Sequence, residues 1–207
     1  MSTEEDAGVE PRQPSRTLVT ALIVGVLAVA LGTFVGTRLS RPPGDGSPEA
    51  GFARDMSAHH AQAVDMAEIV RTTSRDPEVL ALATDIVLSQ QAQIGQMRGW
   101  LDVWRVPPSR STTAMAWMGH RMNRSAMPGM ASRDDIAALR SMSPADAEVR
   151  FLQLMIPHHR GGVDMAKAVL ERTGRSEVRA LAEAIVLSQQ SEIRNMRAML
   201  RARGASE

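Results

Sequence analysis

The sequence FARDMSAHHAQAVDMA at positions 52–67 returns as FLQLMIPHHRGGVDMA at positions 151–166. Each copy opens on phenylalanine, continues to a methionine and two adjacent histidines, and closes on Val-Asp-Met-Ala. The match continues without a gap over 52–101 and 151–200, where about half of the paired positions are identical. The chain therefore contains an internal duplication. Four of its five histidines occupy equivalent places in the two copies, so function is sought there first.

The apolar spacing within each copy is that of a helical hairpin. In the first copy, apolar residues and one histidine recur at steps of four and three residues, which places them on one helix face. Its members are Phe52, Met56, His59, Ala63, Met66 and Val70. Asp76 followed by Pro77 favours a new helix start, with aspartate as the cap and proline at the first position. Two such hairpins predict an all-α domain, a four-helix bundle over 52–203.

The composition excludes several classes of site. The chain of 207 residues has no cysteine, which rules out disulfides, thiolate zinc sites and cysteine nucleophiles. A net charge of +1 gives no overall field that would attract nucleic acid. The 14 methionines are unusual, and most of them lie near a histidine or another methionine.

The N-terminal part is expected to tether the domain to a membrane. Residues 1–16 are polar and predicted to be disordered. Residues 17–39 contain a long uncharged apolar run, which as a helix spans about 30 Å and favours a single-pass transmembrane anchor. A cleaved signal sequence is the alternative, although its apolar core is usually shorter. Two arginines flank the run on each side, so charge does not set its orientation. Residues 40–51 are predicted to be a linker rich in proline and glycine.

The segment between the repeats, 102–150, has no counterpart elsewhere in the chain. A short helix is predicted over Thr112–Met122, and Met-Pro-Gly-Met at 127–130 predicts a turn. Ser132 is predicted to cap another short helix that runs to about Ser141.

The paired histidines are the first candidate site. His59 lies on the apolar stripe of its helix, and His158 repeats the arrangement in the second copy. The adjacent His60 and His159 lie about 100° round the helix, because each residue turns an α-helix by that angle. A buried imidazole without a partner is costly. If the hairpins pack with pseudo-twofold symmetry, up to four imidazoles meet in the centre, ringed by thioethers. The thioethers concerned are those of Met56, Met66, Met155 and Met165.

Copper is the metal that this combination favours, since imidazole suits several transition metals and thioether selects Cu(I). Other transition metals are not excluded. A redox enzyme of the ferritin-like di-iron type would need Glu-x-x-His pairs, and no histidine here has a glutamate three residues before it. The protein is therefore predicted not to be an enzyme. Gln90 and Gln189, polar residues on apolar stripes, are expected to hydrogen-bond a ring nitrogen and fix its tautomer.

Purely structural roles remain the alternative for these residues. Histidines at such positions are often core residues with satisfied hydrogen bonds, methionines commonly fill cores, and duplication copies structural residues as faithfully as functional ones. A second candidate metal site lies in the insert, where thioethers cluster in a polar segment. It comprises Met115, Met118, His120, Met122, Met127 and Met130. A hydrophobic lid that includes Trp117 explains the same cluster equally well.

These motifs resemble a bacterial family. Three motifs carry the similarity: Met-Ile-x-His-His-x-Gly-x-x-x-Met-Ala from Met155, Ile-x-x-x-Gln-x-x-Glu-Ile-x-x-Met from Ile185, and the intervening Met-Pro-Gly-Met. By these motifs, the chain is similar to the His/Met-rich, ferritin-like "domain of unknown function" family that includes the CopM-type copper-binding proteins. The resemblance covers about 52–200. It implies a ferritin-like bundle on the extracytoplasmic side and copper binding in some members.

The resemblance also implies particular ligands. By position in the motif these are His59, His60, Met66, Met155, His158, His159 and Met165. The first copy departs from the pattern, because Gln93 stands where the second copy has Glu192, and Ser57-Ala58 replaces Ile156-Pro157. The first site is therefore expected to be weaker or less symmetric.

The sequence as a whole predicts a membrane-anchored, extracytoplasmic copper-binding protein for sequestration or handover of Cu(I). Its partners would be the copper ion, the membrane and a copper-handling protein or a second copy of the chain. Two alternatives stay open: a metal-independent, membrane-tethered interaction bundle, and a ferritin-like redox enzyme.

Overall fold

The computed structural model describes residues 23–33, 41–108 and 113–207. The chain divides into two compact units at Pro42–Pro43, and each is described by itself. In the first unit, residues 23–33 form a helix whose large apolar side chains are exposed. Within the described ranges, no helix combines the length and the apolar composition needed to cross a bilayer. The predicted anchor at 17–39 extends on both sides into residues outside the described ranges, and the predicted tail at 1–16 lies wholly outside them.

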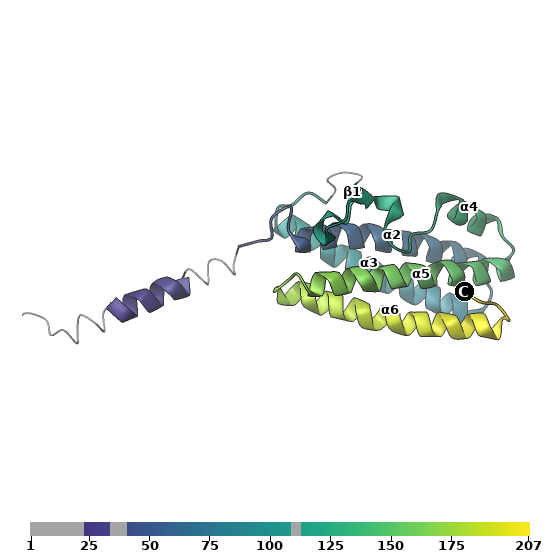
Figure 1. Ribbon diagram of the computed structural model, residues 1–207. Helices are drawn as coiled ribbons and strands as arrows, with labels where there is room; N and C mark the ends of the chain where they lie inside the picture. Colours follow the sequence, from purple (N-terminus) through teal and green to yellow (C-terminus); the bar gives the residue numbers. More distant parts are fainter. Residues whose placement is uncertain (1–22, 34–40, 109–112) are drawn as a thin grey trace, which may run out of the picture. The chain divides into compact units, whose positions relative to one another are not determined.

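The second unit is built from four long helices that form two antiparallel hairpins (Figure 1). Helix α2, Pro48–Thr73, pairs with α3, Pro77–Val103, and α5, Pro144–Leu170, pairs with α6, Ser176–Ala202. The two hairpins meet through α2 and α5. The prediction of a mainly helical domain is confirmed.

The first helix begins four residues before the expected start of the domain at Phe52. Ser47 is the N-cap, its hydroxyl accepting from Ala50 N at 3.2 Å, and Pro48 is the first helical residue. Arg54 pairs with Asp45 and donates to the Pro107 carbonyl at 2.7 Å, which folds the preceding residues back onto α2. The predicted linker at 40–51 therefore ends in ordered structure that belongs to the domain.

The insert differs from its prediction, because no helix runs through the described part of Thr112–Met122. Strand β1, Thr113–Ala114, pairs antiparallel with β2, Met122–Asn123. A single 3₁₀ turn, η1 at Ala116–Met118, lies between the strands, flanked by left-handed residues at Met115 (φ 65°) and Gly119 (φ 87°). These left-handed residues prevent a continuous helix. A second 3₁₀ turn, η2, follows at Arg124–Ala126.

The end of the insert follows its prediction. Helix α4 covers Arg133–Ser141 and begins with a capping box, in which Ser132 and Asp135 satisfy each other's backbone N–H groups. Ser143 then caps α5 by accepting from Asp146 N. Helix α5 consequently begins seven residues before the second repeat starts at Phe151, which lengthens the contact that it makes with the first hairpin.

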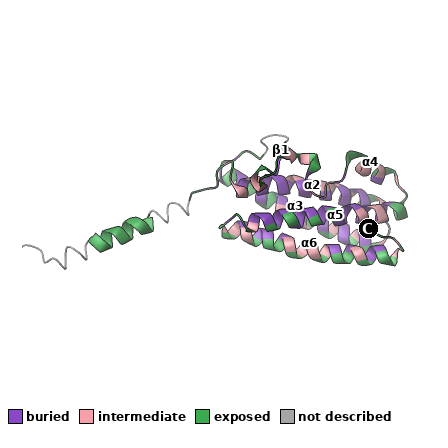
Figure 2. Cartoon of the chain, in the orientation of Figure 1, coloured by how far each residue is buried: buried purple, intermediate pink, exposed green. Residues whose placement is uncertain are grey.

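Two apolar cores fill the interior, and each contains one of the repeated phenylalanines. Buried residues run along all four long helices (Figure 2). The Phe52 core includes Phe52 and Met56 from the start of α2 and Met165 and Val169 from the end of α5. The Phe151 core includes the opposite ends of the same helices. Its members from these helices include Met66, Val70, Phe151 and Met155. Because the start of α2 packs with the end of α5 and vice versa, the two helices run antiparallel, which agrees with a pseudo-twofold relation between the hairpins.

Candidate metal centre

A buried polar layer separates the two cores. We call it the histidine layer, and it consists of His59, His60, Gln90, His158, His159 and Gln189. Its four imidazoles are 0% exposed and its two amides 2% exposed. On α2, for example, Met56 belongs to the Phe52 core and Met66 to the Phe151 core, and the histidines lie between them. All four long helices contribute to the layer.

His59 and His158 meet at the contact between α2 and α5. Their ring centroids are 3.8 Å apart and their planes are inclined by 31°. The two residues are repeat equivalents, so the contact lies where the pseudo-twofold relation brings the hairpins together. The predicted approach of the two histidine pairs is therefore confirmed for this pair.

The outer histidines contact the second helix of their own hairpin. His60 Nε2 lies 2.7 Å from Gln93 Oε1, and His159 Nε2 lies 2.5 Å from Glu192 Oε2. The same bond thus recurs in both repeats, with an amide in one and a carboxylate in the other. His59 Nε2 instead lies 3.0 Å from the carbonyl oxygen of Pro128, in the insert.

Gln90 and Gln189 do not make the hydrogen bonds to a ring nitrogen that the sequence predicts. Neither side-chain amide has a hydrogen-bond partner on any of its atoms within the described part of the chain. The residue three positions further along each helix, Gln93 or Glu192, is the ring partner instead. In the sequence these two residues mark a difference between the copies, and the signal that identifies them is that both are polar at equivalent positions.

Five ring nitrogens in the histidine layer have no hydrogen-bond partner among the described residues. They are Nδ1 of His59, His60, His158 and His159, and Nε2 of His158. Even so, no three His, Asp or Glu side chains in the described ranges converge as a ready-made cation site. The four predicted imidazoles therefore share one layer without forming a preassembled cage, and His59 and His158 are the pair in closest contact.

The predicted thioether ligands lie on both sides of the histidine layer. Met56, Met66, Met155 and Met165 are all 0% exposed. Met56 and Met165 belong to the Phe52 core, and Met66 and Met155 belong to the Phe151 core. The spacing of His and Met in each copy thus places one methionine from each repeat in each core.

The buried imidazoles of His59, His60 and His158 are neutral at ordinary pH. Burial lowers the pKa of His59 from 6.5 to about 4, against an opposing effect of the hydrogen bond to Pro128. Burial also lowers the pKa of His60 to about 3. The pKa of His158 lies well below its usual value, first because of burial and then because of the other histidines. Neutral imidazole is the form that binds a metal ion.

A turn of the insert covers the histidine layer. Gly129 in this turn has φ +77°, and a Cβ there would overlap the Pro157 carbonyl oxygen and the His158 Cα atom. On the facing helix, a Cβ on Gly161 would overlap the carbonyl oxygen of Pro128. Gln62 on α2 fixes the end of the turn, because its amide donates to Ala131 O at 3.0 Å and accepts from Ala131 N at 2.7 Å. Glycine is therefore required where the two backbones touch.

The methionines of the insert pack onto the Phe52 core. Met115 and Met127 are buried in that core, and Met118, Met122 and Met130 are partly buried against it. The remaining member of the predicted second site, His120, is exposed. Trp117 joins the same core and meets Phe52 edge-on, with ring centroids 6.0 Å apart. This arrangement corresponds to the hydrophobic lid that was the alternative interpretation of the cluster.

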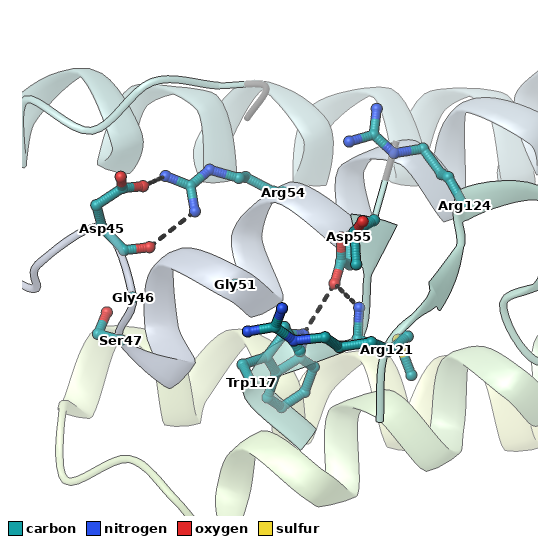
Figure 3. Close-up of a pocket in the computed structure, with 12 residues that line it drawn as sticks. Asp45, Gly46, Ser47, Gly51, Arg54, Asp55, Trp117, Arg121 and Arg124 are labelled. Carbon is teal, nitrogen blue, oxygen red and sulfur yellow. Dashed lines mark hydrogen bonds and ion pairs between the residues drawn. The ribbon is translucent and has the colours of Figure 1, made fainter. Parts of the chain in front are cut away.

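Asp55 anchors that lid to α2, at the edge of a pocket of about 420 Å³ (Figure 3). Its Oδ2 accepts from Met115 N at 2.7 Å and from Trp117 Nε1 at 3.0 Å. Burial raises the pKa of Asp55, while these two hydrogen bonds oppose the shift. The repeat equivalent of Asp55 is Leu154. The carboxylate is thus specific to the first copy.

Comparisons with known proteins agree on the family and on the fold. A family model described as "Domain of unknown function (DUF305)" matches residues 49–200. A DUF305 protein from Streptomyces coelicolor, described as a candidate secreted protein, is 48% identical over 79% of this chain and 98% of that chain, with a TM-score of 0.75. CopM in its Cu(I)-bound form is 28% identical over 75% of this chain and 96% of that chain, with a TM-score of 0.59.

CopM in its Cu(II)-bound form is 29% identical, with a TM-score of 0.61 over 75% of this chain and 97% of that chain. The uncharacterized protein L153 of Acanthamoeba polyphaga mimivirus is 35% identical over 84 residues, which make up 41% of this chain. The match spans 47% of the length of that relative, or about half of it.

Proposed function

The chain belongs to the DUF305 family, and we propose that it is an extracytoplasmic copper-binding protein whose metal centre is the histidine layer. The protein would sequester copper or hand it to a partner, rather than carry out a reaction. The proposed ligands are drawn from His59, His60, His158 and His159, with thioethers from the two flanking cores. Met56, Met66, Met155 and Met165 supply these thioethers.

The observation that carries the proposal is the state of His158. Its ring is fully buried, and neither of its nitrogens makes a well-formed hydrogen bond with a described residue, although the His59 backbone lies close enough to oppose part of the lowering of its pKa. A neutral imidazole keeps one N–H, and leaving such a donor buried without a partner costs about 1–3 kcal/mol. The adjacent His59 also has a free Nδ1. Two neutral, buried imidazoles whose ring centroids are 3.8 Å apart suit a metal ion better than they suit an apolar core.

Copper is proposed because of the donor set and the relatives. Imidazoles between two cores that contain thioethers favour a soft ion, and Cu(I) is the softest ion that such a site commonly binds. CopM, whose structure resembles this one, is known in Cu(I)-bound and Cu(II)-bound forms. Cu(I) is our proposal for this chain, on the strength of the thioethers. The arrangement of two antiparallel hairpins supports the assignment to a ferritin-like four-helix bundle.

The cellular location is part of the proposal. The apolar run at 17–39 is proposed as a single-pass anchor that holds the C-terminal domain outside the cytoplasm, with a secreted protein as the result if the run is cleaved. The Streptomyces coelicolor relative, described as a candidate secreted protein, supports an extracytoplasmic location. Copper delivery would then involve a copper-handling protein or a second copy of this chain.

A second candidate function is a metal-independent, membrane-tethered interaction bundle. It is favoured by the absence, within the described ranges, of three converging His, Asp or Glu side chains. A redox enzyme is less well supported. Among the described histidines, His159 is the one that contacts a carboxylate, that of Glu192, whereas a di-iron centre needs several inward carboxylates.

Metal-linked stability separates these candidates. A ligand that binds only the folded state raises its stability by RT ln(1 + [L]/Kd). Anaerobic Cu(I) should therefore raise the melting temperature of the full-length chain, and a Cu(I) chelator should reverse the rise. His158→Leu should abolish the rise, whereas the exposed control His120→Gln should retain it. An equal rise in His158→Leu, or no rise in the natural protein, would refute a centre at His158.

A further inference from the structure

Three ring nitrogens of the histidine layer face hydrogen-bond acceptors. The Nε2 atoms of His59 and His159 face the Pro128 carbonyl oxygen and a Glu192 carboxylate oxygen. A carbonyl or an ionised carboxylate can only accept, so each of these Nε2 atoms carries the proton. His60 Nε2 faces Gln93, whose amide can present either end. The Oε1 end is the one that matches the carboxylate at the equivalent position in the other repeat.

In a neutral ring, the opposite nitrogen then carries no proton and has an unshared lone pair. A neutral imidazole has one N–H and one acceptor nitrogen. In the neutral form that binds a metal ion, a ring whose Nε2 is protonated accepts through Nδ1, and Nδ1 of His59, His60 and His159 has no partner among the described residues. The acceptors that face Nε2 thus determine that Nδ1 is the atom available to bind a metal ion on each of these three histidines. No described acceptor makes a well-formed hydrogen bond with His158, so its tautomer is not set in this way.

The two repeats differ in the acceptor that faces the outer histidine. Glu192 carries a negative charge where Gln93 is a neutral amide. A carboxylate that accepts from a metal-binding imidazole raises the basicity of that ring and fixes its orientation. The Glu192 side chain is 19% exposed and the His159 side chain is 0% exposed, so the carboxylate remains partly solvated while its partner is buried.

Building on the proposed copper site, we propose that the histidine layer presents Nδ1 atoms to the metal and that Glu192 is a positioning residue that makes His159 a stronger donor than His60. The first half of this proposal concerns the metal-free protein, and the second concerns metal affinity. A separate experiment tests each half, so failure of the tautomer assignment is distinguishable from failure of copper binding.

The tautomers are measured on the full-length, metal-free chain. Long-range ¹H–¹⁵N spectra of protein labelled at histidine distinguish a protonated ring nitrogen from an unprotonated one, and single-histidine variants assign the signals. His59 and His159 should both carry a proton on Nε2, and His59 should have an unprotonated Nδ1. An unprotonated Nε2 on either ring, or a proton on Nδ1 of His59, would overturn the assignment. His60 should follow His159, and the opposite tautomer there would show that Gln93 presents its amide nitrogen.

The role of Glu192 is measured by Cu(I) competition with two matched variants. Glu192→Gln retains an acceptor for His159, so its tautomer and folding should not change, while Cu(I) affinity should fall about 10- to 100-fold. Gln93→Glu places the second carboxylate beside His60 and should raise the affinity. Unchanged affinity in Glu192→Gln would overturn the positioning role. If the natural protein binds no Cu(I), the copper proposal and the role of Glu192 both fail, and the tautomer assignment still stands on its own spectra.

Discussion

His59 and His158 are 99 positions apart in the sequence, and their rings meet in a tilted contact between α2 and α5 with centroids 3.8 Å apart. The contact joins the two halves of an internal duplication at equivalent residues. It also places two neutral imidazoles at a point where a hydrophobic core would normally be continuous. Both stability and metal binding should therefore depend on the state of these rings.

Stability should fall on acidification below pH 6.5. The pKa of His59 is about 4 and that of His60 about 3 in the folded protein, against about 6.5 in the unfolded chain. Because these pKa values are depressed on folding, their contribution to stability is fully present above pH 6.5 and is lost as pH falls towards 4 and 3. The 2.5-unit shift of His59 corresponds to about 3 kcal/mol. Urea unfolding from pH 7.5 to 4, followed by tryptophan fluorescence, measures this loss.

The matching control is the exposed histidine of the insert. His120→Gln should leave the acid dependence of the unfolding free energy unchanged, whereas His59→Gln should reduce it. A pH profile that is flat between 6.5 and 4 would contradict the burial of neutral imidazoles in the folded state.

Replacing the unpartnered amide of Gln189 by an apolar side chain should stabilise the metal-free domain. The buried amide has no hydrogen-bond partner among the described residues, and each buried, unpaired polar group costs about 1–3 kcal/mol. Gln189→Leu should therefore raise the unfolding free energy by about 1–2 kcal/mol. Destabilisation by more than about 1 kcal/mol would show that the amide makes a bond important for folding, as the sequence had suggested.

Adding a methyl group where the covering turn meets α5 should destabilise the domain. Gly129→Ala and Gly161→Ala each force a Cβ against backbone atoms of the other segment. Each should lower the unfolding free energy by about 1–3 kcal/mol, and Gly129→Ala should lower it further because of its positive φ. Gly95→Ala is the control. This glycine is exposed within α3 with nothing close to it, so alanine there should stabilise by about 0.5–1 kcal/mol.

Gln62 should hold the covering turn to α2. Its side chain makes two hydrogen bonds with the backbone of Ala131, which is 8% exposed. Gln62→Ala leaves both backbone groups without a partner and should lower the unfolding free energy by about 2 kcal/mol. Gln96→Ala, an exposed change on α3, should alter it by less than about 0.5 kcal/mol. Equal effects of the two variants would argue against a clamp at Gln62.

The sequence was most informative where structure is local. Helix periodicity and capping residues predicted the four long helices and placed His59 on the face that meets the other hairpin. The apolar stripe indicates that Gln90 is buried, but it does not indicate which polar residue of α3 contacts a neighbouring ring. That depends on how α3 is rotated against α2, and this rotation placed Gln93 beside His60.

The insert was the hardest part to predict, because distant residues determine its structure. The helix expected at Thr112–Met122 gives way to a left-handed residue at Met115, whose N–H donates to Asp55 on α2. The close approach of Gly129 to α5 likewise depends on the absence of a side chain at Gly161. Neither of these two contacts between distant residues follows a regular sequence spacing from which it could be predicted.

The most direct test of the central claim is an anaerobic Cu(I) titration of the full-length chain against a competing chelator. It is run beside a variant in which His59, His60, His158 and His159 are all alanine, once circular dichroism has established that this variant is folded. If that variant does not fold, His158→Leu takes its place. We predict tight uptake by the natural protein and its loss in the variant. Equal uptake by both proteins, or none by either, would contradict a copper centre in the histidine layer.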